Sequence, residues 1–96
     1  MIVRVAPVAR RQMIDARHWW RRNRHKAPNA FDEDIDEVLT QLADEPRAGL
    51  AVRGRLRGMR RIYLARIRYY LYYRVLPEFV QVTAIRHAAR RPRREP

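Results

Sequence analysis

Two stretches in the first half of the chain carry apolar residues at helical spacing. The first runs from Val8 to about Asn23, and its apolar stripe consists of Ala9, Met13, Ala16 and Trp20. The apolar stripe of the second consists of Phe31, Ile35, Val38, Leu39 and Leu42. Spacings of three and four residues place each stripe on one face of an α-helix. Pro7 suits the first turn of the first helix, and Pro28 lies in the break between the two. The pattern therefore predicts a helical hairpin.

The second half of the chain alternates bulky and polar residues, which is typical of β-strands. The predicted strands run from Met59 to Ala65, from Tyr69 to Leu76 and from Phe79 to Ile85. A further short β-like run covers Ile2 to Val5, and we interpret the basic segment from Leu50 to Gly58 as an edge or mobile segment. We expect an α+β fold: a short strand, a helical hairpin and three antiparallel strands, forming one sheet with both helices packed on one face.

Charge is distributed unevenly along the 96 residues. The chain has 22 Lys and Arg against 10 Asp and Glu, a formal net charge of +12. Residues 28–45 nevertheless contain no Lys or Arg and seven acidic residues, namely Asp32, Glu33, Asp34, Asp36, Glu37, Asp44 and Glu45. The rest of the chain is therefore densely cationic, and such a surface favours anionic partners. Nucleic acid and an acidic protein are the two partner classes that this charge predicts.

The length suits a single small domain. We assign residues 1–89 to it and expect the basic tail of residues 90–96 to be disordered when free. The chain has no cysteine, and its apolar start is interrupted by Arg4 and Arg10, so a signal peptide or membrane span is not indicated. We expect a cytoplasmic protein that makes no use of the membrane. No glycine-rich phosphate loop or metal-ligand spacing is present, so we expect no cofactor and no metal.

Several short motifs, taken in order, resemble the RelE/ParE toxins of bacterial toxin-antitoxin pairs. The first helix, together with "NAF" and "L..EPRAG" around the second, is similar to the opening half of that family. The tyrosine-rich "RYYLYYRV" and the ending "IRHAARRP" are similar to its carboxyl-terminal half. The resemblance implies the same α+β layout, with the first strand beside the last strands. It also implies a cognate antitoxin protein, partly disordered before it folds onto the toxin in a toxin-antitoxin hetero-oligomer.

Two mechanisms occur in the family that the chain resembles. RelE-like members are ribosome-dependent messenger-RNA endonucleases, and ParE-like members poison DNA gyrase and cleave nothing themselves. A metal-free ribonuclease needs an acid, a base and cations around the scissile phosphate. For that alternative the candidate catalytic residues are His87, Arg61 and Arg68, on a common active face. The family's nucleases commonly have a tyrosine just after the equivalent histidine, whereas this chain has Ala88 and Ala89. The ending therefore resembles ParE-like members.

We accordingly predict a ParE-like toxin that inhibits gyrase and arrests growth, with a RelE-like endonuclease and a non-catalytic nucleic-acid-binding module as alternatives. The candidate target-binding residues are Arg60, Arg74, Arg90 and Arg91. A simpler interpretation is that His87 is a strand-end histidine bonded to the backbone and that the arginines of the strands are solvated, namely Arg60, Arg61, Arg68 and Arg74.

Aromatic residues are the remaining candidates for binding. Trp19 and Trp20 are the predicted antitoxin-binding residues, although Trp20 also fits the apolar stripe of its helix. The tyrosines of the hairpin alternate, so two are expected to pack beneath the helices and two to face outward, where covering the sheet competes with base stacking. These four residues are Tyr69, Tyr70, Tyr72 and Tyr73.

Overall fold

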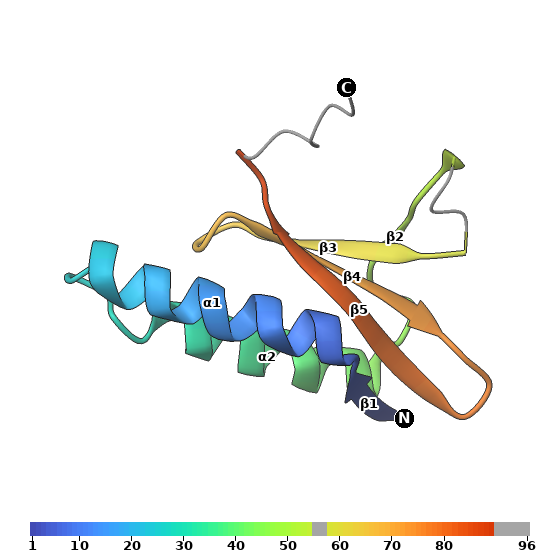
Figure 1. Ribbon diagram of the computed structural model, residues 1–96. Helices are drawn as coiled ribbons and strands as arrows, with labels where there is room; N and C mark the ends of the chain where they lie inside the picture. Colours follow the sequence, from blue (N-terminus) through green and yellow to red (C-terminus); the bar gives the residue numbers. More distant parts are fainter. Residues whose placement is uncertain (55–57, 90–96) are drawn as a thin grey trace.

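The protein consists of two helices and a five-stranded sheet in a computed structural model that describes residues 1–54 and 58–89 (Figure 1). In chain order the elements are β1 (Ile2–Val5), α1 (Pro7–Asn23), α2 (Ala30–Asp44), β2 (Leu50–Ala51), β3 (Arg60–Leu64), β4 (Tyr69–Val75) and β5 (Phe79–His87). The predicted α+β class, the helical hairpin and the three long strands are confirmed. The predicted disordered tail of residues 90–96 lies outside the described residues, as do residues 55–57.

The strands lie in the order β1-β5-β4-β3-β2. The three long strands form two antiparallel pairs, and β1 runs parallel to β5, with Ile2 opposite Phe79 and Val5 opposite Val82. The first strand therefore joins the sheet beside the last, as the family resemblance implied. The segment predicted as edge or mobile contributes the two-residue strand β2, which pairs with β3 at the edge of the sheet.

Both helices cover the same face of the sheet, and no helix lies on the other face of the part shown in colour in Figure 1. The core between the layers contains Ala9, Ala16 and Trp20 of α1, Phe31, Ile35, Val38 and Leu42 of α2, and Leu71, Tyr73, Val80, Val82 and Ile85 of the sheet. This apolar layer explains the apolar stripes of the two helices, because each stripe is buried only when its helix packs on the sheet. Within the described part, neither helix is long and apolar enough to cross a bilayer.

Cross-strand pairing assigns each strand residue to one of two faces, because side chains alternate with a period of two. We call the side covered by α1 and α2 the helix face. The opposite side is the open face, and its side chains are Ile2, Arg4, Leu50, Arg61, Tyr63, Tyr70, Tyr72, Arg74, Phe79, Gln81, Ala84 and Arg86. Of the four hairpin tyrosines, Tyr69 and Tyr73 lie on the helix face and Tyr70 and Tyr72 on the open face. The expected division into two pairs is confirmed for the two faces, but Tyr72 is only 9% exposed and is therefore buried on the open face.

A β-bulge in β5 changes which residues face the helices. Tyr73 is opposite Val82 but Tyr72 is opposite Ala84, so Thr83 is an extra residue in β5. Its hydroxyl donates a hydrogen bond to the Tyr72 carbonyl at 3.2 Å. Because one inserted residue reverses the alternation that follows, Ile85 is buried on the helix face. His87 lies on that face as well, and Arg86 lies on the open face.

The turn between β3 and β4 is attached to the start of α2. The Arg66 guanidinium donates hydrogen bonds to the Asp34 carboxylate, the shortest at 2.6 Å, and to the Glu33 carboxylate at 3.0 Å. These bonds, first to Asp34 and then to Glu33, hold the pKa of Arg66 above its usual range. Ile67, which is buried, projects from the same turn into the core. The hairpin is therefore fixed relative to the helices at the end of the sheet where β5 finishes.

Candidate functional site

The open face carries three rows of side chains that cross the sheet from strand to strand. The first row contains Arg86, Tyr70 and Tyr63, and the second contains Ala84, Tyr72 and Arg61. The third row contains Arg4, Gln81 and Arg74. All four of these arginines are exposed. The strand pairing thus holds cations and rings in a fixed order on a surface that the helices leave uncovered.

Arginines and aromatic rings are in direct contact on the open face. The guanidinium carbon of Arg61 lies 4.4 Å from the centre of the Tyr70 ring, and that of Arg4 lies 4.5 Å from the centre of the Phe79 ring. The Tyr63 and Tyr70 rings are 5.0 Å apart. Cation–π contacts of this kind restrict the guanidinium group while leaving its N–H donors available to solvent or ligand. The open face is therefore a partly ordered cationic surface.

Acidic residues are kept away from the strands. Within residues 1–54 and 58–89, they lie on the two helices, at Glu45 directly after α2, or at Glu78 in the turn between β4 and β5. Seven of them fall between Asp32 and Glu45, on or next to α2 behind the helix face. The acidic residues of α2 therefore lie on the helix side of the sheet, whereas the open face displays arginines.

The three predicted catalytic residues do not share a face. His87 lies on the helix face, where its ring contacts the Tyr69 ring edge-on at 5.0 Å and its Nδ1 accepts a hydrogen bond from the Ala89 N–H at 3.2 Å. Arg61 lies on the open face, and Arg68 is exposed in the turn before β4 with a φ of 62°. The expectation of a common active face is wrong, because the bulge at Thr83 turns His87 away from Arg61.

The predicted target-binding arginines are also separated. Arg74 lies on the open face, whereas Arg60 lies on the helix face and donates from Nη1 to the Gly49 carbonyl at 2.7 Å. Arg60 therefore holds the chain before β2 in place instead of facing outward. Arg90 and Arg91 lie outside the described residues. Arg4 and Arg86 were not predicted as residues of this face. The parallel pairing of β1 with β5 places Arg4 on it, and the bulge in β5 places Arg86 on it.

The two tryptophans of α1 have different environments. Trp20 is buried in the core, and its indole Nε1 donates to the Ala27 carbonyl at 2.7 Å. It is therefore not exposed to a partner, and its assignment as an antitoxin-binding residue is corrected. Trp19 is 37% exposed, with the Arg24 guanidinium carbon 5.0 Å from its ring centre. Of the two tryptophans, Trp19 is the one at the surface.

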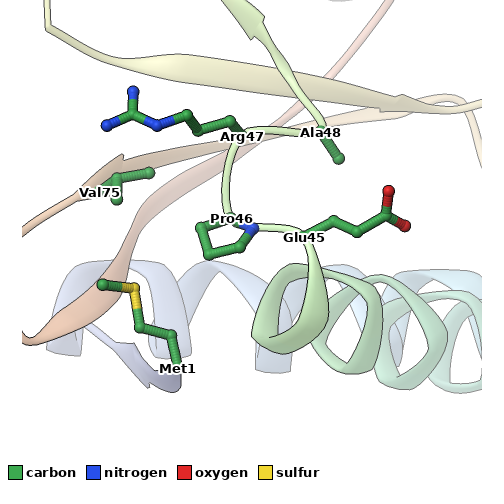
Figure 2. Close-up of a pocket in the computed structure, with 6 residues that line it drawn as sticks. All are labelled: Met1, Glu45, Pro46, Arg47, Ala48 and Val75. Carbon is green, nitrogen blue, oxygen red and sulfur yellow. The ribbon is translucent and has the colours of Figure 1, made fainter.

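A cavity of about 480 Å³ opens at the end of the sheet near the chain's first residue (Figure 2). It is lined by Met1, Glu45, Pro46, Arg47, Ala48 and Val75. None of the predicted site residues that the structure describes lines it. In the described part of the chain, no group of three His, Cys, Asp or Glu side chains is placed to hold a metal ion.

A sequence model described as the ParE toxin of the type II toxin-antitoxin system parDE matches residues 3–92. The chain belongs to the ParE toxin family. Toxin RelE3 of Caulobacter vibrioides is 35% identical to this ParE-family toxin over 94 residues, which cover 93% of this chain and 96% of the relative. The protein is thus a toxin of the type II toxin-antitoxin class and of the RelE/ParE superfamily, as its motifs indicated.

Solved structures confirm the fold of this ParE-family toxin. A chain of the chromosomal ParDE system of P. aeruginosa has a TM-score of 0.75 at 20% identity, covering 91% of this chain and 95% of that one. A chain of the toxin-antitoxin complex RelBE2 of Mycobacterium tuberculosis has a TM-score of 0.65 at 26% identity, covering 90% and 95%. The YoeB/ParE toxin of Agrobacterium tumefaciens has a TM-score of 0.59 at 20% identity, covering 91% and 98%.

Proposed function

We propose that this ParE-family toxin arrests growth in the cytoplasm by inhibiting DNA gyrase, that it cleaves no nucleic acid itself, and that a cognate antitoxin neutralises it. The observation that supports inhibition without cleavage is the separation of His87 from the open-face arginines. A metal-free ribonuclease needs a proton-transferring group within hydrogen-bond reach of the phosphate that its cations bind. Here the sheet lies between the histidine and Arg61, so the arginines are suited to binding rather than to chemistry.

We propose a cognate antitoxin because the similar P. aeruginosa and M. tuberculosis structures are named as a toxin-antitoxin system and a toxin-antitoxin complex. An acidic, partly disordered segment would complement the exposed arginines of the open face and would associate faster because of the opposite charge. Trp19, exposed on α1, offers an apolar contact for the same partner. Antitoxin binding would then neutralise the surface that acts on the target.

The test is a supercoiling assay with purified gyrase and relaxed plasmid. The toxin should inhibit supercoiling at micromolar concentration, and the double variant Arg61→Gln/Arg74→Gln should not. The matched control is Arg10→Gln/Arg11→Gln, which removes the same charge from exposed positions on α1. We expect the control to inhibit as well as the wild type. Absence of inhibition by the wild-type toxin would contradict the gyrase proposal.

A RelE-like endonuclease is the second candidate, and the similarity to Toxin RelE3 favours it. Its signature would be new messenger-RNA ends in translated messages after induction, mapped by primer extension. The decisive variant is His87→Ala. Cuts that appear with the wild type and disappear with this folded variant would establish the endonuclease in place of the gyrase proposal.

A further inference from the structure

We infer that two copies of this toxin associate through the outer surface of the helical hairpin, with α1 of each copy lying on α2 of the other. This outer surface is the side of α1 and α2 that faces away from the sheet (Figure 1). The dimer is a property of the toxin alone and requires neither gyrase nor an antitoxin. It also leaves the open face uncovered, because the sheet lies between that face and the hairpin.

The two helices carry charges of opposite sign. α1 has five arginines and one acidic residue, whereas α2 has six acidic residues and no Lys or Arg. The buried stripe of each helix fixes its outward side, because residues about half a turn away from the stripe face solvent. Exposed residues on that side are Arg11 and Arg22 of α1 and Asp36, Glu37 and Asp44 of α2.

These outward charges are not neutralised within one copy. In the part of the chain that the structure describes, ion pairs join Arg21 to Asp32 and Arg66 to Glu33 and Asp34. None of these pairs involves the two outward arginines of α1 or the three outward carboxylates of α2. A surface that is positive along one helix and negative along the next is complemented by a surface with the reverse order of charge. A second copy of the same hairpin supplies that surface.

A two-fold axis parallel to the helices matches positive with negative charge on both sides of the interface. α1 and α2 are neighbours that run in opposite directions, and Arg21 near the end of α1 bonds Asp32 near the start of α2 at 2.9 Å. Rotation about an axis between the two hairpins, along the helices, places each α1 on the α2 of the other copy. Arg11 lies about 15 Å before Arg21 along α1, at about 1.5 Å per residue. Asp44 lies about 18 Å beyond Asp32 along α2, so Arg11 and Asp44 meet at nearly the same height.

The size and composition of the hairpin surface indicate a weak, salt-sensitive dimer. Ile14 is 42% exposed on the outward side of α1, so a small apolar contact lies among the charges. Two helices about 25 Å long and about 10 Å apart present roughly 500 Å² per copy, which gives about the 1,000 Å² in total that a specific interface needs. The two helix layers hold the open faces more than about 20 Å apart, well beyond the Debye length of about 8 Å, so their mutual repulsion is screened.

The experiment is sedimentation velocity of the purified toxin at several protein concentrations, in about 50 mM and about 500 mM salt. We expect a species of twice the monomer mass at low salt. The dissociation constant should rise by about tenfold or more at high salt, because salt screens the charge pairs that hold the copies together. A wild-type toxin that is monomeric at both salt concentrations would overturn the inference.

Two charge-reversal variants test the pairing of the helices. The acidic variant is Arg11→Glu/Arg22→Glu, and the basic variant is Asp36→Lys/Asp44→Lys. Each variant alone should be monomeric at low salt, because its two helices then carry charge of the same sign. An equal mixture of the two should form a heterodimer, because each α1 then meets an α2 of opposite charge. Circular dichroism shows whether each variant is folded, and the milder Arg11→Gln/Arg22→Gln replaces the acidic variant if that one does not fold.

The matched control is Arg61→Glu/Arg74→Glu, which reverses two exposed charges on the open face. It should dimerise as the wild type does, and it should form no heterodimer with the basic variant. Dimers of either folded reversal variant alone, a mixture of the two that stays monomeric, or loss of the dimer in the control would each overturn the inference. The supercoiling result is independent of these outcomes, because gyrase is absent from the assay.

Discussion

The two faces of the sheet are built from the same strands but serve opposite purposes. On the helix face, Leu71, Tyr73, Val80 and Val82 are fully buried beneath α1 and α2. On the open face, exposed arginines alternate with these residues along β4 and its neighbours. Because neighbouring residues point to opposite sides, one strand can contribute stability on one side and recognition on the other. Substitutions on the helix face should therefore change the free energy of unfolding, and substitutions on the open face should change function.

Shifting the alternation beyond the bulge is expected to have the largest effect. Insertion of one alanine between Thr83 and Ala84 would reverse the faces of the residues that follow, so that Ile85 would face solvent and Arg86 would face the helices. Burial of an unpaired guanidinium costs more free energy than the small net stability of a domain this size, so we expect an unfolded protein by circular dichroism. Thr83→Val keeps the residue count and should cost only about 1 kcal/mol for the lost hydrogen bond. An insertion variant with wild-type melting would show that the residue count of β5 does not set the faces.

Residues on the two faces of the paired strands β4 and β3 provide the next test. Leu71→Ala empties a fully buried site on the helix face and should lower the free energy of unfolding by about 2–5 kcal/mol. Tyr63→Ala, at an exposed site of the open face, should change it by about 1 kcal/mol or less. Chemical denaturation measures both. Similar losses from the two variants would mean that the open face is packed like a core.

A smaller effect is expected at Gly49, where the chain passes close to the sheet. A Cβ atom added there would lie 2.8 Å from both the Arg61 carbonyl oxygen and the Tyr73 hydroxyl, which accepts the Gly49 N–H at 2.8 Å. Gly49→Ala should therefore lower the free energy of unfolding by about 1–3 kcal/mol, because it disturbs a buried hydrogen bond and tight packing. Ala48→Ser, at the exposed neighbouring position, should be neutral within about 0.5 kcal/mol.

The smallest effect is predicted at Arg68, whose φ of 62° lies in the left-handed region that glycine adopts readily. Arg68→Gly should raise the free energy of unfolding by up to about 1 kcal/mol, measured by denaturation, since relief of strain exceeds the added freedom of the unfolded chain. Growth arrest by this variant should equal that of the wild type. Loss of growth arrest with a stable Arg68→Gly protein would show that Arg68 takes part in the function of the toxin.

The sequence predicted what depends on local periodicity. The helical stripes of Ala9 to Trp20 and of Phe31 to Leu42, and the alternation of the tyrosines, indicated the helices, the strands and the covered face. The position of His87 could not be read in this way, because a single extra residue at Thr83 reverses the alternation after it. A signal was present: uninterrupted alternation would have buried Arg86 and exposed Ile85, which is unfavourable.

Contacts between segments that are distant in the sequence could not be predicted from local periodicity either. Alternation along β3 places Arg60 on the same face as Ile62 and Leu64, and its guanidinium is accommodated there because the Gly49 carbonyl, from the chain before β2, accepts its hydrogen bond. Trp20 was recognised as part of an apolar stripe, and only the fold shows that the Ala27 carbonyl satisfies its indole N–H. Such roles depend on which loop lies over which strand, and sequence spacing does not encode that.

The central claim is that the arginines of the open face, and not His87, are responsible for toxicity. The most direct measurement is growth after induction of three proteins at equal soluble levels: the wild type, His87→Ala and Arg61→Gln/Arg74→Gln. We predict that the wild type and His87→Ala arrest growth alike and that the double arginine variant does not. Arrest by the double arginine variant, together with normal growth of cells making a folded His87→Ala protein, would contradict the claim.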